Sequence, residues 1–152
     1  MMNQRKVIGH IPPAFVPHDA WFFITICCRQ RGPDQLCHPQ VSSVLLEDGV
    51  FYHTRHRWIL HLLLLMPDHL HLIAAFPMGD VQAETIRNWK RLTARRTGIV
   101  WQKNYFDHRV RQEEGLKLKT DYIRQNPVRA NLVKDVEAWP HFVDYRSIPE
   151  GR

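Results

Sequence analysis

Apolar side chains follow a strand-like pattern in three stretches of the chain. Residues 21–28 are aromatic or β-branched apart from the final two cysteines, and they precede the turn-like segment RGPD, which predicts a strand. Two further apolar runs, residues 58–66 and 69–76, are separated only by Pro67 and Asp68. We expect these two runs to be strands joined by a tight turn.

Three other segments carry apolar residues at the three- and four-residue spacing of a helix. Residues 39–56 show this spacing, and residues 80–97 combine an apolar stripe with a basic opposite surface and a candidate N-cap at Asp80. The segment 113–125 predicts a last helix that stops close to Pro127, because a residue before proline is pushed away from helical angles.

The order of these elements predicts the fold class. A fourth strand fits within 99–110, and the segment 131–152 is expected to form irregular structure or short turns. The resulting α+β order is that of a ferredoxin-like βαββαβ sheet with two helices on one face, an open second face and an additional C-terminal helix. A chain of 152 residues suits one domain, so we expect an N-terminal extension over 1–20, a domain over 21–130 and a tail packed on it.

Charge and cysteine content narrow the class of protein. The net charge of +6 comes entirely from residues 81–152, with fifteen basic and nine acidic side chains, because residues 1–80 hold six of each. A positive excess favours a polyanionic partner. Three cysteines without regular spacing, and no apolar stretch near the roughly 20 residues that span a bilayer, predict a soluble cytoplasmic protein with no membrane partner.

The start of the third predicted strand carries two histidines. Alternate strand residues share a face, so His69 and His71 project together while Leu70 and Leu72 point into the core. Two imidazoles on one face can bind one divalent cation; alternatively, they are simply polar residues on the solvent side of the sheet. Asp68 either orients one of these histidines as a hydrogen-bond acceptor or is only the polar residue of the turn.

The last predicted helix carries a tyrosine and an asparagine one turn apart. Tyr122 and Asn126 lie on the same helical face. A neutral tyrosine hydroxyl is a poor nucleophile, but a nearby metal can help it react; the alternative is a half-buried tyrosine that packs beside Ile123. Asp107 and His108 form either an acid–base pair or a contact that orients a loop.

Basic and aromatic side chains are interleaved between residues 87 and 111. This mixture is expected where phosphates meet cations and bases stack on rings, although a solvated helix face is the more common meaning of such charges. Because all the net charge lies in this half, we favour nucleic-acid binding. The candidate nucleic-acid-binding residues are Arg87, Lys90, Arg91, Arg95, Lys103 and Arg109.

Three motifs in this order resemble those of one family. The segments MPDHLHLI (66–73), WQKNYFDHR (101–109) and YIRQNPVRA (122–130) are similar to those of the REP-associated tyrosine transposases, relatives of the single-tyrosine insertion-sequence transposases of the HUH superfamily. The resemblance covers about residues 20–140. It departs from the family pattern at Asn131, where a glycine is frequent, and after Pro140.

The resemblance implies a metal-dependent enzyme that acts on single-stranded DNA, often beside a hairpin. His69 and His71 match the His-hydrophobic-His pair, Tyr122 matches the nucleophile, and Asn126 matches the polar residue that assists the metal site; the cofactor would be Mg2+ or Mn2+. Cleavage would leave a 5'-phosphotyrosine and a free 3'-hydroxyl, and a later attack would rejoin the DNA. Asp68, Asp107 and His108 are possible supporting residues.

The active form is expected to be a monomer or a homodimer. Two other functions compete with a transposase acting at palindromic sequences. A non-catalytic nucleic-acid-binding module would use the same sheet and basic helix without a metal. A replication-initiator or relaxase nickase is closer in chemistry, but such enzymes usually have longer chains with partner domains.

Overall fold

The central element of the computed structural model is a five-stranded antiparallel sheet. The structure describes residues 21–79, 81–110 and 113–148. The predicted N-terminal extension and the candidate cap Asp80 therefore lie outside the described residues. The strands follow one another across the sheet in the order β4-β1-β3-β2-β5. Their bounds are β1 Trp21–Cys27, β2 Ile59–Met66, β3 His69–Ala75, β4 Phe106–Val110 and β5 Phe142–Asp144.

The first four strands confirm the predicted ferredoxin-like fold. Their spatial order, β4-β1-β3-β2, with every neighbouring pair antiparallel, is that of a βαββαβ sheet. The turn at Pro67 and Asp68 joins β2 to β3, as the sequence predicts.

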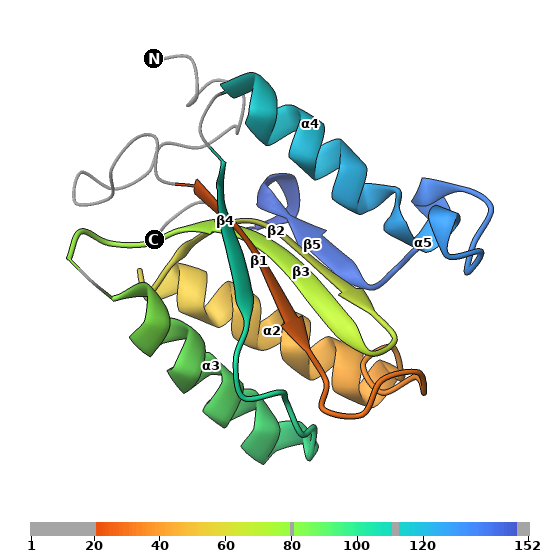
Figure 1. The fold of residues 1–152 in the computed structure, drawn as a ribbon, viewed down its shortest axis with the longest axis horizontal. Helices are drawn as coiled ribbons and strands as arrows, with labels where there is room; N and C mark the ends of the chain where they lie inside the picture. Colours follow the sequence, from red (N-terminus) through yellow and green to blue (C-terminus); the bar gives the residue numbers. More distant parts are fainter. Residues whose placement is uncertain (1–20, 80, 111–112, 149–152) are drawn as a thin grey trace.

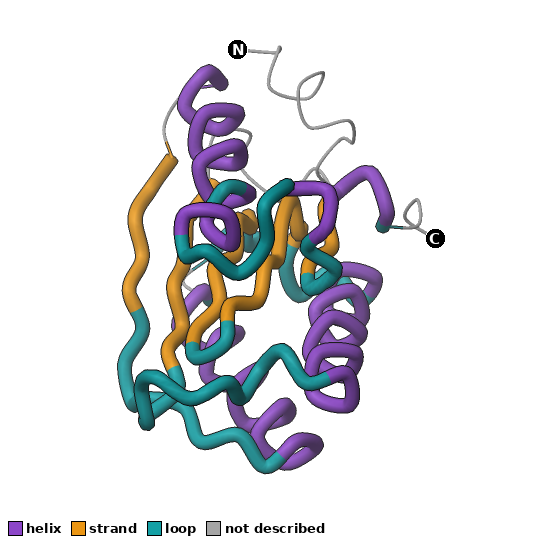
Figure 2. The backbone as a smooth tube through the Cα atoms, turned by 90° about the vertical axis from the view of Figure 1, so that its right-hand side faces the viewer, coloured by secondary structure: helices purple, strands orange, loops and turns teal. Residues whose placement is uncertain are grey.

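Helices lie on both faces of the sheet (Figures 1 and 2). Helices α2 (Pro39–Thr54) and α3 (Gln82–Thr97) cover one face. On the opposite face lie α4 (Glu113–Arg124) and the short α5 (Asn126–Arg129). Pro127 is tolerated in α5 because it lies in the first turn of that helix, where its missing N–H costs no hydrogen bond.

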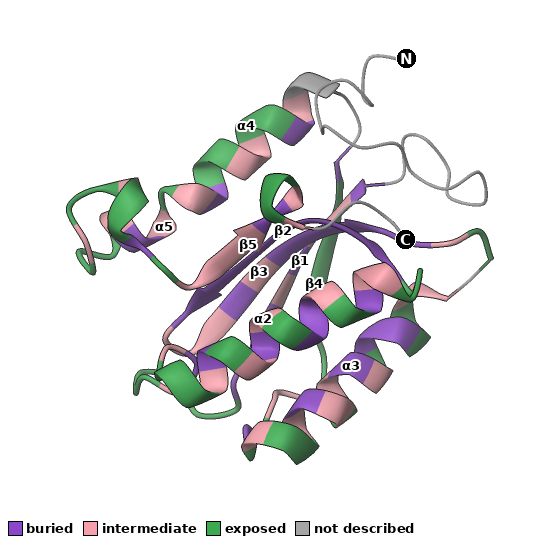
Figure 3. Cartoon of the chain, turned by 180° about the vertical axis from the view of Figure 1, so that it is seen from behind, coloured by how far each residue is buried: buried purple, intermediate pink, exposed green. Residues whose placement is uncertain are grey.

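The expectation of an open second face is therefore wrong in part. This face carries its own apolar cluster, in which Leu62, Leu64 and Ile73 of the sheet pack with Leu116 and Ile123 of α4. All residues of β2 are buried, which requires that other elements pack on both faces of that strand. Figure 3 shows the result, with buried residues along the central strands and exposed residues along β4.

Two predicted segments differ from the structure. The fourth strand is only Phe106–Val110; residues 99–105 form a loop that touches the sheet through one bridge between Cys28 and Trp101. In the tail, Phe142–Asp144 adds an edge strand to β2, between 3-10 turns at Val136–Ala138 and Tyr145–Ser147. The tail is thus part of the sheet and not only irregular structure.

Candidate active site

The two histidines begin β3 on the face covered by α4. In the sheet register, His69 is opposite Cys27 and His71 is opposite Thr25, while Leu70 and Leu72 point to the other side and are fully buried. The imidazole rings face each other edge-on, with their centroids 4.9 Å apart. Strand alternation therefore brings both rings to one partly buried position, as the sequence indicates.

Asp68 fixes the orientation of the first imidazole. Its carboxylate lies 2.8 Å from Nδ1 of His69, and it also accepts hydrogen bonds from Arg31 at 2.9 Å and from the amide of Gly32 at 2.7 Å. Although burial opposes its charged form, the hydrogen bonds from these neighbours hold the pKa of Asp68 well below its usual range. A carboxylate that binds Nδ1 leaves Nε2 of His69 for another partner.

Thr25 does the same for the second imidazole. Its hydroxyl lies 2.9 Å from Nδ1 of His71, and the ring of Phe23 packs against the imidazole at 5.3 Å between centroids. Burial, followed by the charges of His69 and Arg129, lowers the pKa of His71 to about 3. His71 is therefore neutral near pH 7, and neutral imidazole is the form that binds a metal.

The tyrosine helix places its phenol ring next to this part of the sheet. Tyr122 on α4 is 55% exposed. The Lys119 ammonium lies 5.8 Å from the centre of the Tyr122 ring and 5.2 Å from that of Phe23, which in turn packs on His71. A continuous series of contacts thus joins the candidate nucleophile to the histidine pair within one chain.

Asn126 follows one turn later and is held by an arginine. The guanidinium of Arg129 donates hydrogen bonds to Oδ1 of Asn126 and to the backbone carbonyl of Tyr122. It also lies over the Tyr122 ring, 4.0 Å from its centre. Arg129 and Lys119 were not among the predicted site residues. The three-residue spacing places Lys119 on the same face of α4 as Tyr122. Arg129 belongs to α5 and reaches back past Gln125 to Tyr122.

The donor set can be compared with the metal that the sequence implies. Among the described residues, no group of three or more His, Cys, Asp or Glu side chains could hold a metal ion. The histidine pair nevertheless has both Nδ1 atoms engaged by the protein, so each ring can offer Nε2 to a cation. By donor type, these two imidazoles and the amide oxygen of Asn126 suit a divalent ion that keeps further positions for phosphate or water.

The end of the tyrosine helix is attached to the edge strand. The guanidinium of Arg124 lies 4.1 Å from the ring centre of Phe142 and 3.8 Å from the carboxylate of Asp144. Asp144 is buried and is also paired with Arg146 at 3.0 Å. The tail therefore fixes the helix two residues after Tyr122.

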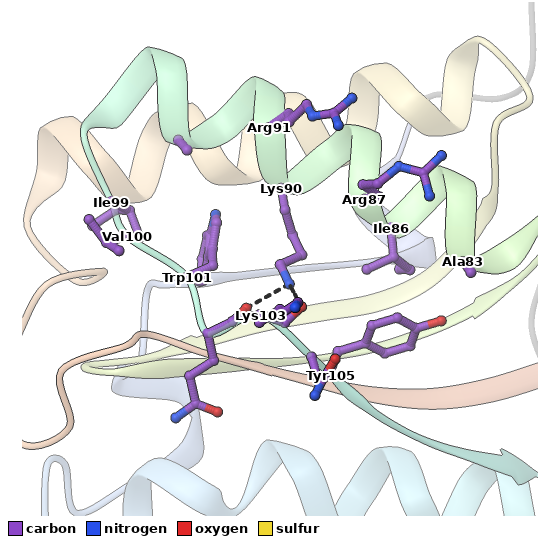
Figure 4. Close-up of a pocket in the computed structure, with 13 residues that line it drawn as sticks. Ala83, Ile86, Arg87, Lys90, Arg91, Ile99, Val100, Trp101, Lys103 and Tyr105 are labelled. Carbon is purple, nitrogen blue, oxygen red and sulfur yellow. Dashed lines mark hydrogen bonds between the residues drawn. The ribbon is translucent and has the colours of Figure 1, made fainter.

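The predicted DNA-binding residues lie mainly on the other side of the sheet. Arg87, Arg91 and Lys103 line a hollow of about 760 Å³ between α3 and the 99–105 loop (Figure 4). Lys90 differs from them, because its ammonium donates to the carbonyls of Gln102 and Lys103 at 2.7 and 3.0 Å. Burial lowers the pKa of Lys90, and its contacts are those of a residue that fastens the loop.

A second basic hollow was not foreseen from the sequence. It has a volume of about 400 Å³ and brings Arg55 and Arg57, after α2, next to Arg91 and Arg95 of α3, with Phe51 at its wall. None of these four arginines pairs with a carboxylate among the described residues. We call the four residues the arginine cleft.

A neighbouring arginine, unlike those of the arginine cleft, is paired with carboxylates. Arg96, on the same helix, is paired with Glu47 at 2.9 Å and Asp48 at 3.1 Å. Sequence patterns could not reveal the arginine cleft, because its two pairs of residues are separated by more than thirty positions and meet only through helix packing.

The remaining predicted residues on β4 point to different faces. Arg109 is paired with Phe22 in the register and lies 5.8 Å over its ring, and Asp107 accepts a hydrogen bond from Gln82 of α3 at 3.0 Å. His108 is opposite Phe23, on the face of the histidine pair, and is exposed. Asp107 and His108 therefore point to opposite faces, and Asp107 lies on the side of α3, away from the histidines.

Comparison with known proteins agrees with the resemblance that the three sequence motifs indicate. The REP-associated tyrosine transposase of Escherichia coli (strain K12) is 27% identical over 143 residues, which cover 90% of this chain and 83% of that protein. A solved structure of a REP-associated tyrosine transposase bound to a REP hairpin matches with a TM-score of 0.71 and 26% identity, over 86% of this chain and 79% of the other. The chain is therefore similar to REP-associated tyrosine transposases in sequence over most of its length and in fold.

Two further matches are more distant or shorter in overlap. A Haemophilus influenzae relative named for the same family is 28% identical over 102 residues, 55% of this chain and 57% of its own length. A crystal structure from Deinococcus radiodurans R1 has 18% identity and a TM-score of 0.54, over 74% of this chain and 95% of that one, and shows a shared fold alone. No protein-family model matches the chain. None of the described helices is long and apolar enough to cross a membrane.

Proposed function

We propose that this protein is a transposase that cleaves and rejoins single-stranded DNA at palindromic, REP-like hairpins, with Tyr122 as the nucleophile. The observation that carries this proposal is the contact series from His71 through Phe23 and Lys119 to Tyr122. A nucleic-acid-binding module needs no such link between a histidine pair and a tyrosine helix. A DNA substrate also implies a cytoplasmic location.

The chemistry assigned to Tyr122 is the transfer of one phosphodiester bond. Its oxygen would attack the phosphorus, forming a tyrosyl 5'-phosphate bond as the bond from phosphorus to the 3'-oxygen breaks. The proton lost by the phenol is balanced by the one gained on the free 3'-hydroxyl. Reversal with another 3'-hydroxyl rejoins DNA without ATP or water, because the phosphodiester energy is retained in the tyrosyl bond.

The metal role falls to His69, His71 and Asn126. A bound Mg2+ or Mn2+ would neutralise charge on the scissile phosphate. Because imidazoles are softer ligands than the oxygens that Mg2+ prefers, Mn2+ suits this set equally well. Asp68 and Thr25 hold the two rings in place, so little reorganisation is needed when the ion binds.

DNA binding is assigned to the exposed cations on the side of α2 and α3. Arg87, Arg91, Arg95 and Lys103 would contact backbone phosphates, joined by Arg55 and Arg57 of the arginine cleft. Arg109 lies at the edge strand β4, where DNA could pass from one face of the sheet to the other. Lys90 is left out of this set, because backbone carbonyls already occupy its ammonium.

The test is covalent trapping on a labelled single-stranded oligonucleotide that contains a REP-like hairpin. With Mn2+, the wild-type protein should form an adduct that survives denaturation, and Tyr122→Phe should form none while binding the hairpin with unchanged affinity. Tyr105→Phe is the matched control, since the Tyr105 hydroxyl is engaged by Gln82 at 3.2 Å on the other face. Its adduct yield should equal that of the wild type.

Each alternative outcome has a definite meaning. An adduct in Tyr122→Phe would rule out Tyr122 as the nucleophile. Hairpin binding without any adduct in the wild type would instead indicate a binding module. Equal adduct yields with and without EDTA would exclude the metal role of His69 and His71.

A further inference from the structure

The guanidinium of Arg129 contacts two residues of the proposed reaction: Tyr122, near the end of α4, and Asn126, the first residue of α5. It donates a hydrogen bond to Oδ1 of Asn126 and lies 4.0 Å from the centre of the Tyr122 ring. Arg129 is exposed and pairs with no carboxylate among the described residues. Its contacts on this helix are therefore to an amide oxygen, a backbone carbonyl and an aromatic ring.

The contact with Asn126 uses the same atom that a metal would need. An asparagine side chain offers its carbonyl oxygen to a cation, whereas its amide nitrogen is a hydrogen-bond donor. A divalent ion on Oδ1 would lie close to the positive guanidinium and would be repelled by it. The guanidinium and the metal thus compete for one oxygen.

We propose that Arg129 is a positioning residue that holds Asn126 and Tyr122 together in the metal-free protein and gives up Asn126 when a divalent cation binds. This inference rests on the proposed metal role of Asn126. In the metal-free protein, the positive guanidinium occupies the amide oxygen that the cation would use. Metal binding and the hydrogen bond between Arg129 and Asn126 then exclude each other.

A purely structural role for Arg129 makes a different prediction. Its hydrogen bond to the carbonyl of Tyr122 satisfies an acceptor near the end of α4, as basic side chains often do at helix C-termini. If that were its whole role, removing Arg129 would lower thermal stability and leave the metal affinity unchanged.

The test is the affinity for Mn2+ alone, measured by calorimetry on the full chain without DNA. Arg129→Met removes the competing donors and should bind Mn2+ about tenfold more tightly than the wild type. In an Asn126→Ala background, the same substitution should not increase the Mn2+ affinity, because the side-chain oxygen for which the guanidinium and the metal compete is absent. The difference between these two effects isolates the competition from general repulsion.

Lys119→Met is the matched control. It removes a positive charge that lies over the same tyrosine ring but has no bond to Asn126. Because its contacts are with aromatic rings and not with the amide oxygen of Asn126, its removal should change the Mn2+ affinity by about twofold or less. If Arg129→Met does not fold, Arg129→Lys replaces it: the lysine keeps the charge but cannot hold both oxygen acceptors, and a smaller tightening is expected.

The outcomes separate this inference from the proposed function. Unchanged Mn2+ affinity in the Arg129 variants, or a gain that persists without Asn126, overturns the competition even if Tyr122-dependent adducts form. Absence of Mn2+ binding in every variant also overturns it. Failure of the wild type to form any adduct, with the Mn2+ competition intact, would overturn the transposase proposal alone.

Discussion

The two faces of the sheet hold their polar groups in opposite ways. On the side of α4, the imidazoles of His69 and His71 are partly buried, and each has one nitrogen bonded to the protein. On the side of α2 and α3, the arginine cleft presents four guanidinium groups that no described carboxylate neutralises. The first arrangement fixes geometry, and the second leaves charge available.

This difference indicates that the α4 face should determine the rate of DNA cleavage and the α2–α3 face the affinity for DNA. Orientation of a metal ligand depends on short contacts that are shielded from solvent, which salt hardly affects. Attraction of a phosphate backbone depends on exposed charge and weakens steeply as salt rises. Substitutions on the two faces should therefore have separable effects.

The largest expected effect is on the face of the histidine pair. His71→Ala should lower the single-turnover rate of hairpin cleavage by about 10² to 10³-fold, because a group that stabilises transition-state charge is lost. Hairpin affinity, measured by fluorescence anisotropy, should stay unchanged. His38→Ala, which alters an exposed histidine bonded to the carbonyl of Asp34, should leave both quantities at wild-type values. A parallel loss of affinity in His71→Ala would contradict the separation of the two faces.

A smaller effect with the opposite signature is expected in the arginine cleft. The double variant Arg55→Gln/Arg91→Gln should weaken hairpin binding about tenfold at low salt and reduce the slope of log affinity against log salt by about 2. Cleavage at saturating protein should not change.

Arg96→Gln controls for charge and helix position in this experiment, since Glu47 and Asp48 already neutralise Arg96. It should keep the wild-type slope. An equal change of slope in Arg96→Gln would show that net charge, and not the arginine cleft, determines affinity.

The smallest effect is expected where the tail fixes the tyrosine helix. Asp144→Asn removes the buried partner of Arg124 and should lower the free energy of unfolding by about 2 kcal/mol, with a few-fold loss of adduct and unchanged hairpin affinity. Asp121→Asn is the control, because its exposed pair with Lys117 should contribute about 0.5 kcal/mol or less. Chemical denaturation and adduct yield measure both; an adduct yield equal to that of the wild type would show that the tail does not position Tyr122.

Local patterns predicted much of the fold and the placement of the histidines. The aromatic strand β1, the β2–β3 hairpin and the shared face of His69 and His71 follow from alternation and turn residues. These features depend on residues that are close in sequence, so the amino-acid sequence alone is sufficient to predict them.

The features that the sequence did not reveal depend on contacts between distant segments. Edge strand β5 has only three residues, too few for a repeat, and forms because β2 offers it a free edge. The 99–105 segment looked like a strand but turns away from β1 after one bridge. The contacts of Lys90 were not foreseen for the same reason, because the loop carbonyls that accept its hydrogen bonds lie twelve and thirteen residues away.

The alternation along β3 also has a consequence for errors in folding. A slip of one residue against β1 would turn Leu70 and Leu72 toward the tyrosine helix and bury both imidazoles in the apolar core. No partly correct site exists between these two registers, because each step of the hydrogen-bond ladder exchanges the faces completely. A molecule of this protein with that one-residue slip therefore lacks the histidine pair on the face of the tyrosine helix altogether, instead of holding a distorted version of it.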